Sequence, residues 1–249
     1  QMLSINALMF SSYTDEIDAR ISKSMINSLV RSYEANPIPS CSHKAASGKN
    51  ILKLGFVSSD FCFHPVGQFF SSFVADLRSL GVKTFLFSNG HIEDEWTKKL
   101  QMTSDSFSSI RDLGAEAASQ VIGKAELDVL IDLSGPTSGN RFDVFALRPC
   151  KVQATYLGFP DSCHMPFIDY VLTDLHHVPN AARELYSEKV VYIDDLRFCF
   201  LKPTHCPPIS LAPVCLNKYL TLGSFANPAK ISDRCLNFWA RALMEVPNS

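Results

Sequence analysis

The stretch ILKLGFVSSDFCFHPVGQFFSSFVADLRSLGVKTFLFS, residues 51–88, predicts a strand, a helix and a second strand in that order. Residues 51–57 and 82–88 are short and mostly apolar, which is typical of parallel strands that are covered on both faces. Between them, apolar residues recur at the i, i+3, i+4, i+7 spacing of a helix with one apolar stripe. The stripe consists of Val66, Phe69, Phe70, Phe73, Val74, Leu77 and Leu80. The stretch therefore predicts one strand–helix–strand unit of an α/β domain.

The same alternation continues along the chain. Residues 128–134, 152–158 and 169–174 read as further apolar strands, and residues 114–126 read as the second clear helix. We therefore expect residues 46–200 to form one α/β domain with a Rossmann-like parallel sheet.

The amino-terminal part has a different pattern. Residues 1–34 have apolar side chains at helical spacing, and residues 36–50 interrupt that spacing with prolines, serines and a glycine. These breaks are typical of a linker. We expect residues 1–45 to be a helical connector followed by a linker.

A second change of pattern follows the sheet domain. Four prolines in residues 201–218 predict a linker without regular structure. Residues 219–225 then read as a strand and residues 231–246 as a helix. Because one strand and one helix cannot bury a core of their own, we expect residues 219–249 to be the truncated start of a second α/β domain.

Composition limits the classes of partner. The chain has 249 residues, 46% of them hydrophobic, and a formal net charge of −2. It has no run of lysines or arginines, which argues against nucleic acid and an anionic membrane as partners. It also has neither a signal peptide nor an apolar run of 18 residues. Its eight cysteines form no CxxC pair, and we expect them to be reduced and mostly buried in a cytoplasmic protein.

His64 lies between the first strand and the first helix. Pro65 suits the first helical turn, so the imidazole should project near the helix start at the carboxyl edge of the sheet. The partial positive charge there favours a neutral ring that can accept a proton or a hydrogen bond. Position alone leaves two interpretations open: a helix-start residue bonded to nearby backbone, or an active-site residue.

Three further loops follow predicted strands, where ligands of open α/β sheets bind. They are SGPTSGNR at 134–141, LGFPDSCHMP at 157–166 and SFANPAKIS at 224–232. In the last loop, Lys230 precedes a helix whose predicted N-cap is Ser232, and a lysine beside free N–H groups can bind phosphate. The GxGxxG, P-loop and GxSxG motifs are absent, which argues against a nucleotide dehydrogenase, a P-loop NTPase and an α/β-hydrolase. Histidine and cysteine spacing predicts no metal site.

Five separated blocks together resemble the catalytic region of the O-linked N-acetylglucosamine transferase and SPINDLY family, especially its bacterial members with tetratricopeptide repeats upstream. The blocks are LGFVSSDFCFHPVGQFF, DVLIDLSGPTSGNRFDVFALRPCKVQATYLGFP, DYVLTD, LYSEKVVYI and TLGSFANPAKISDRCLNFWARALMEVPNS. The resemblance implies a GT-B glycosyltransferase, of which this chain would hold the first Rossmann-like domain and the truncated start of the second.

The resemblance also implies an activity. Such enzymes transfer a sugar with inversion to Ser or Thr hydroxyls of proteins, and they need no metal or other cofactor. The donor would be UDP-N-acetylglucosamine or, in the SPINDLY branch, GDP-fucose. Upstream tetratricopeptide repeats and a cytoplasmic location, or a nuclear one in a eukaryote, are implied too. The fragment alone would be inactive.

Residue by residue, the resemblance implies that His64 is the catalytic residue and that Asn227 and Lys230 bind the phosphates of the donor. Substrate-binding positions would be Pro65, Thr137, Leu157, Gly158 and Pro160. Two features depart from the family: Pro136 stands where most relatives have His or Tyr, and Asp161–His164 replaces a Gly-Thr-rich turn. These departures leave a non-catalytic scaffold or binding relative as an alternative. A third hypothesis is a metabolic GT-B enzyme that acts on small-molecule acceptors.

Overall fold

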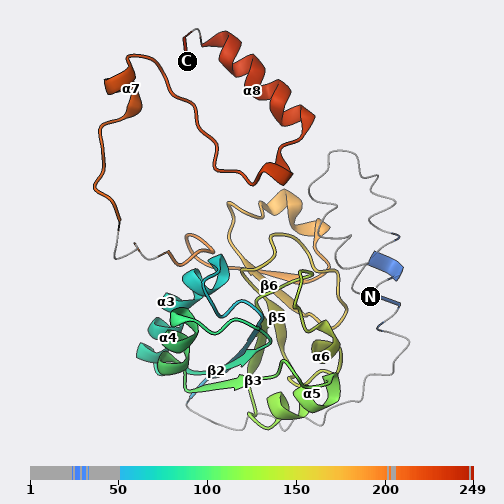
Figure 1. Cartoon of the computed structure of the whole chain (residues 1–249). Helices are drawn as coiled ribbons and strands as arrows, with labels where there is room; N and C mark the ends of the chain where they lie inside the picture. Colours follow the sequence, from blue (N-terminus) through green and yellow to red (C-terminus); the bar gives the residue numbers. More distant parts are fainter. Residues whose placement is uncertain are drawn as a thin grey trace.

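A computed structural model of the chain describes residues 24, 26–28, 30, 31, 33, 51–200, 202, 206–246, 248 and 249. Its centre is one sheet with the strand order β3-β2-β1-β4-β5-β6-β7, in which every neighbouring pair is parallel (Figure 1). The strands are β1 Lys53–Ser58, β2 Lys83–Ser88, β3 Ser106–Ser109, β4 Val129–Asp132, β5 Gln153–Thr155, β6 Tyr170–Thr173 and β7 Lys189–Tyr192. The predicted parallel α/β sheet is confirmed.

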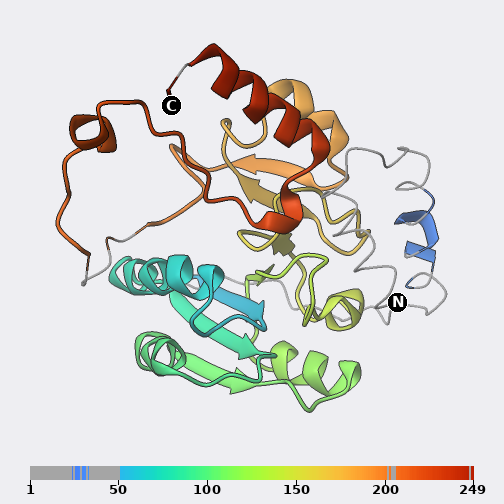
Figure 2. The ribbon, with the colours of Figure 1, turned by 45° about the horizontal axis from the view of Figure 1, so that its top comes forward.

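Helices cover both faces of this sheet (Figure 2). Helices α3 and α4 lie on one face and α5 and α6 on the other, and the 3₁₀ helix η1 follows β6. Their bounds are α3 Pro65–Ser79, α4 Glu95–Thr103, α5 Ala115–Gly123, α6 Phe142–Ala146 and η1 Asn180–Leu185. The two predicted helices are thus confirmed as α3 and α5, whereas α4, α6, β3 and β7 were not predicted.

Aromatic packing of α3 against the sheet forms one of two apolar cores. Phe70 on α3 and Phe56 on β1 are completely buried, with ring centroids 4.7 Å apart in an edge-to-face arrangement. The last member of the predicted stripe, Leu80, is 77% exposed because the helix ends at Ser79; Leu80 is its C-cap, and the left-handed Gly81 (φ +76°) follows. The second core lies under α5 and α6.

The described residues between 24 and 33 are helical, as predicted. Tyr33 is buried and its ring meets that of Phe167 edge-on at 5.2 Å, so this helix contacts the α6 side of the sheet. The rest of the predicted connector, residues 1–45, lies outside the described residues.

Two predictions for the carboxyl-terminal segment were wrong. The proline-rich linker contains a short helix, α7 Pro213–Asn217. Its last proline, Pro213, occupies the first turn of this helix, where no N–H partner is needed. Residues 219–225 form no strand in the described chain, since an extended segment needs a neighbouring strand to pair with.

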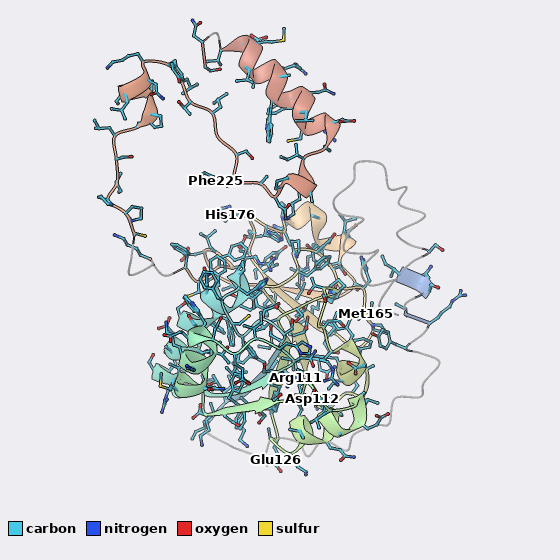
Figure 3. All side chains as sticks on the ribbon, viewed as in Figure 1. Arg111, Asp112, Glu126, Met165, His176 and Phe225 are labelled. Atoms are coloured by element: carbon cyan, nitrogen blue, oxygen red, sulfur yellow. The ribbon has the colours of Figure 1, made fainter. Side chains whose placement is uncertain are left out.

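The helix predicted at 231–246 is confirmed as α8 Asp233–Glu245, with Ser232 as its N-cap. Neither α7, α8 nor the 3₁₀ helix η2 Pro228–Lys230 buries a residue. Phe225, labelled in Figure 3, is fully exposed on this segment.

The cysteine prediction is confirmed in part. The seven described cysteines are free, but only Cys62, Cys150 and Cys163 are buried, and Cys206 and Cys215 are exposed. Cys41 lies outside the described residues. Within the part of the chain that the structure describes, no helix is long and apolar enough to cross a membrane.

Candidate active site at the carboxyl ends of the strands

Strand order makes β1 and β4 the topological switch point of the sheet. From β1 the chain runs outward to β2 and β3, then returns to β4 and continues in the other direction. The loops after β1 and β4 meet at this point, where the Ser59 hydroxyl lies 3.5 Å from the Ser138 carbonyl oxygen, and ligands of open α/β sheets bind at such a point. Residues 59–64 and 133–141 form these two loops.

His64 is both the N-cap of α3 and a half-exposed ring. Its Nδ1 accepts the backbone N–H of Val66 at 3.3 Å and lies 3.7 Å from Oδ2 of Asp60, while 45% of the side chain is exposed. With Nδ1 accepting, the neutral ring carries its proton on Nε2. The first interpretation, a residue bonded to nearby backbone, is therefore confirmed, and the ring still presents an N–H donor.

The loop that carries His64 is folded tightly over the first turn of α3. A Cβ atom on Gly67 would lie 2.2 Å from the carbonyl oxygen of Cys62 and 2.8 Å from that of Asp60. Such distances leave room for no side chain, so only glycine at position 67 lets the loop approach the helix this closely.

Hydrogen bonds hold the β4 loop against its neighbours. Thr137 donates its hydroxyl to the Ser134 carbonyl at 2.9 Å. The side-chain amide of Asn89, directly after β2, donates to the Gly139 carbonyl at 3.0 Å and accepts from the buried Arg141 at 3.3 Å. The loops after β2 and β4 are thus joined. No role was predicted for Asn89 or Arg141.

The β5 loop packs directly against the β4 loop. A Cβ atom on Gly158 would lie 1.9 Å from the Leu133 carbonyl oxygen, and one on Gly135 would lie 2.2 Å from Cβ of Phe159. Leu157 is buried in the left-handed region (φ +72°). The structure therefore brings together the loops that contain three predicted sugar-pocket residues, Thr137, Leu157 and Gly158.

Pro160 follows these residues in the β5 loop and lies on the surface. Its side chain is exposed, and its carbonyl oxygen lies 2.7 Å from Nε2 of His177 and accepts the Tyr186 hydroxyl at 3.1 Å. The predicted substrate residue Pro65 is also exposed, at the first position of α3.

Asp132, at the end of β4, is a fully buried carboxyl group that was not predicted as a site residue. Burial raises its pKa from 3.8 to about 6, although hydrogen bonds from the N–H groups of Gly135 (2.6 Å) and Ser134 (3.2 Å) and from the Thr155 hydroxyl (3.2 Å) oppose the rise. The only sequence signal was an acidic residue that ends the apolar run VLID. The carboxyl group thus shapes the turn that begins the β4 loop.

The turn that departs from the family, Asp161–His164, is held by the buried carboxylate of Glu188. That carboxylate accepts the Ser162 hydroxyl at 2.5 Å and the backbone N–H groups of Cys163 and His164 at 2.8 and 3.1 Å. His164 has φ +54°. Pro136, the other departure, is buried in the β4 loop.

The two predicted phosphate ligands lie on the carboxyl-terminal segment. Asn227 caps η2 by accepting the Ala229 N–H at 3.0 Å, and Lys230 ends that helix, two residues before the α8 N-cap. Both residues are exposed. Among the described residues, no group of three or more His, Cys, Asp or Glu side chains could hold a metal ion.

Residues 16–202 match the family model described as Glycosyl transferase family 41. The chain belongs to this family. Among curated relatives of this family-41 chain, the probable UDP-N-acetylglucosamine–peptide N-acetylglucosaminyltransferase SPINDLY of Petunia hybrida is 31% identical, over 80% of this chain and 22% of that relative. A probable enzyme of the same kind from Arabidopsis thaliana, SEC, is 28% identical over 83% of this chain and 22% of the relative.

Comparison with solved structures agrees with this family membership. A solved structure of a mutant O-GlcNAc transferase from Thermobaculum terrenum superposes with a TM-score of 0.87 at 24% identity, covering 98% of this chain and 46% of that one. The predicted GT-B-type α/β fold is thereby confirmed. The chain spans about a fifth of the length of the curated relatives it matches.

Proposed function

We propose that this chain carries the acceptor-side part of a protein O-glycosyltransferase, which transfers N-acetylglucosamine from its UDP donor to Ser or Thr hydroxyls. Family membership supports the reaction class, and the relatives' names specify this donor and peptide acceptors. The observation that carries the proposal is the half-exposed His64 ring after β1, at the topological switch point between β1 and β4. Upstream tetratricopeptide repeats and a cytoplasmic location belong to the same proposal.

In the proposed reaction, the acceptor hydroxyl attacks the anomeric carbon, the bond from that carbon to the diphosphate breaks, and the hydroxyl proton leaves. With its proton on Nε2, His64 acts as a hydrogen-bond donor to a sugar or acceptor oxygen. To take the hydroxyl proton instead, Nε2 must be unprotonated, which moves the ring proton to Nδ1. That tautomer gives up the hydrogen bond from the Val66 N–H to Nδ1, and the negative charge of the Asp60 carboxylate, whose Oδ2 lies 3.7 Å from Nδ1, favours it.

The departing diphosphate gains negative charge in the transition state. A lysine side chain at 230 and the partial positive charge at the amino-terminal end of α8 are suited to stabilise it. We assign Asn227 to the same end of the donor, and Pro65, Thr137, Leu157, Gly158 and Pro160 to the wall around the sugar. In this proposal no metal or other cofactor takes part.

A transfer assay tests the proposal. The 249-residue chain and the longest reading frame that contains it are each incubated with UDP-N-acetylglucosamine and Ser/Thr peptides, with GDP-fucose as a parallel donor. His64→Ala should lower kcat by about 10²-fold to 10⁴-fold, the usual contribution of a positioned acid or base. His91→Ala, which alters an exposed histidine after β2, is the matched control. Intact turnover in His64→Ala would remove the proposed role, and donor binding without transfer would favour a scaffold.

A further inference from the structure

Helix α4 begins beside the loop that carries His64. Its N-cap is Asp94, whose Oδ1 accepts the backbone N–H groups of Trp96 at 2.9 Å and Thr97 at 3.0 Å. The Thr97 hydroxyl accepts the Asp94 N–H at 3.1 Å, which completes a capping box. Capping thus uses one carboxylate oxygen of Asp94 and leaves Oδ2 for another partner.

Both capping residues also bond the His64 loop. Oδ2 of Asp94 accepts the N–H of Phe63 at 2.6 Å, and the buried Thr97 hydroxyl donates to the Phe61 carbonyl at 2.7 Å. Phe63 directly precedes His64 in the chain. The main chain on the amino-terminal side of the histidine is therefore bonded at two points to the start of α4, 31 to 36 residues away in sequence.

Two further contacts, one before Phe61 and one after His64, also constrain the loop. The Ser58 hydroxyl accepts the Asp60 N–H at 3.0 Å, and the missing side chain at Gly67 lets the loop lie on α3. The loop is thus held between α3 and α4. Burial alone would raise the pKa of Asp94, but the N–H groups of Phe63, Thr97 and Trp96 outweigh it and hold the pKa below its ordinary value. The carboxylate is accordingly ionised at neutral pH.

We propose that Asp94 and Thr97 are positioning residues for His64: the start of α4 fixes the loop that holds the imidazole at the switch point between β1 and β4. The effect on the loop follows from these bonds, whereas the effect on turnover rests on the proposed function. In the sequence, the only sign of the pair is the D-x-x-T spacing of 94–97.

Asp94→Asn separates the two roles of the carboxylate. The amide oxygen can still cap α4, because Asn is as good an N-cap as Asp. The amide NH₂ then faces the N–H of Phe63, so two donors meet and the loop bond is lost. Thr97→Val removes the second loop bond with little change of shape, and it also removes the acceptor of the Asp94 N–H in the capping box. Thr103→Val is the matched control, since the Thr103 hydroxyl bonds only carbonyls of its own helix, those of Lys99 and Leu100.

The first measurement is amide hydrogen exchange across residues 61–64, followed by mass spectrometry on the same preparation that is used for transfer. In Asp94→Asn and Thr97→Val, we expect exchange in this window to be about tenfold faster or more, matching the loss of roughly one hydrogen bond. In Asp94→Asn, the amides of α4 should exchange as in the unmodified protein. Unchanged exchange across 61–64 in both variants would overturn the proposal.

The second measurement is steady-state transfer by the longest reading frame that contains the chain. Because a small displacement of a catalytic group can cost up to about 10²-fold, we expect kcat to fall about tenfold or more in both variants while KM for the donor stays constant. Thr103→Val should leave both constants unchanged. A faster-exchanging loop with normal kcat would also overturn the proposal. If even the unmodified protein transfers no sugar, the proposed function fails, while the exchange data still decide whether α4 fixes the loop.

Discussion

Asp132 should make the stability of this chain depend on pH in an unusual direction. Its folded-state pKa is raised by burial from 3.8 to about 6. Below pH 3.8 the group is protonated in both the folded and the unfolded state, so its contribution to stability is fully present there. As the pH rises from 3.8 to about 6, the unfolded state ionises this group while the folded state keeps it protonated, so the free energy of unfolding falls; the loss is complete once the pH exceeds about 6. A shift of about two units corresponds to roughly 3 kcal/mol.

The assay compares urea unfolding of the unmodified chain with that of Asp132→Asn between pH 4 and pH 8. All other ionisable groups are the same in both proteins, so the difference between the two free energies of unfolding isolates position 132. We expect that difference to shift by about 3 kcal/mol in favour of the variant as the pH rises. A difference that stays constant, or that shifts the other way, would refute the assignment of a raised pKa.

Further substitutions test the packing around the site. Phe70→Ala should lower the free energy of unfolding by about 3 to 5 kcal/mol, measured in urea, because the ring is completely buried against Phe56; a loss below 1 kcal/mol would contradict this. Gly158→Ala should cost about 1 to 3 kcal/mol, since its methyl group meets the Leu133 carbonyl, and a crystal structure should show the β5 loop displaced; an unmoved loop would show that the contact is not tight. Arg141→Met should cost about 1 to 3 kcal/mol because it leaves buried carbonyl groups without donors, whereas unaltered stability would mean that water replaces them.

Local pattern was enough to predict the centre of the fold. β1, β2 and α3 were predicted because an apolar run and a helical stripe are properties of contiguous sequence. The strand β3, Ser106–Ser109, was missed because SFSS is mostly polar and lies at the edge of the sheet. Residues 219–225 were predicted as a strand but form none among the described residues, since strand preference depends on neighbours that sequence alone does not supply.

A residue of the candidate site was predictable only where its immediate neighbours in the sequence indicate its place in the fold. His64 could be placed at a helix start because Pro65 follows it, and the structure confirms that position. Asn89, Asp94 and Asp132 could not be found, because each matters through a partner that lies far away in sequence or through burial. The assignments of Asn227 and Lys230 to the donor stay predictions.

The most direct test of the central claim is the mass of an acceptor peptide after incubation with UDP-N-acetylglucosamine and the longest reading frame that contains this chain. Peptides with Ser or Thr should gain one N-acetylhexosamine, and peptides with Ala at those positions should not. His64→Ala should abolish the gain and His91→Ala should preserve it. An equal gain with His64→Ala would show that His64 has no part in transfer.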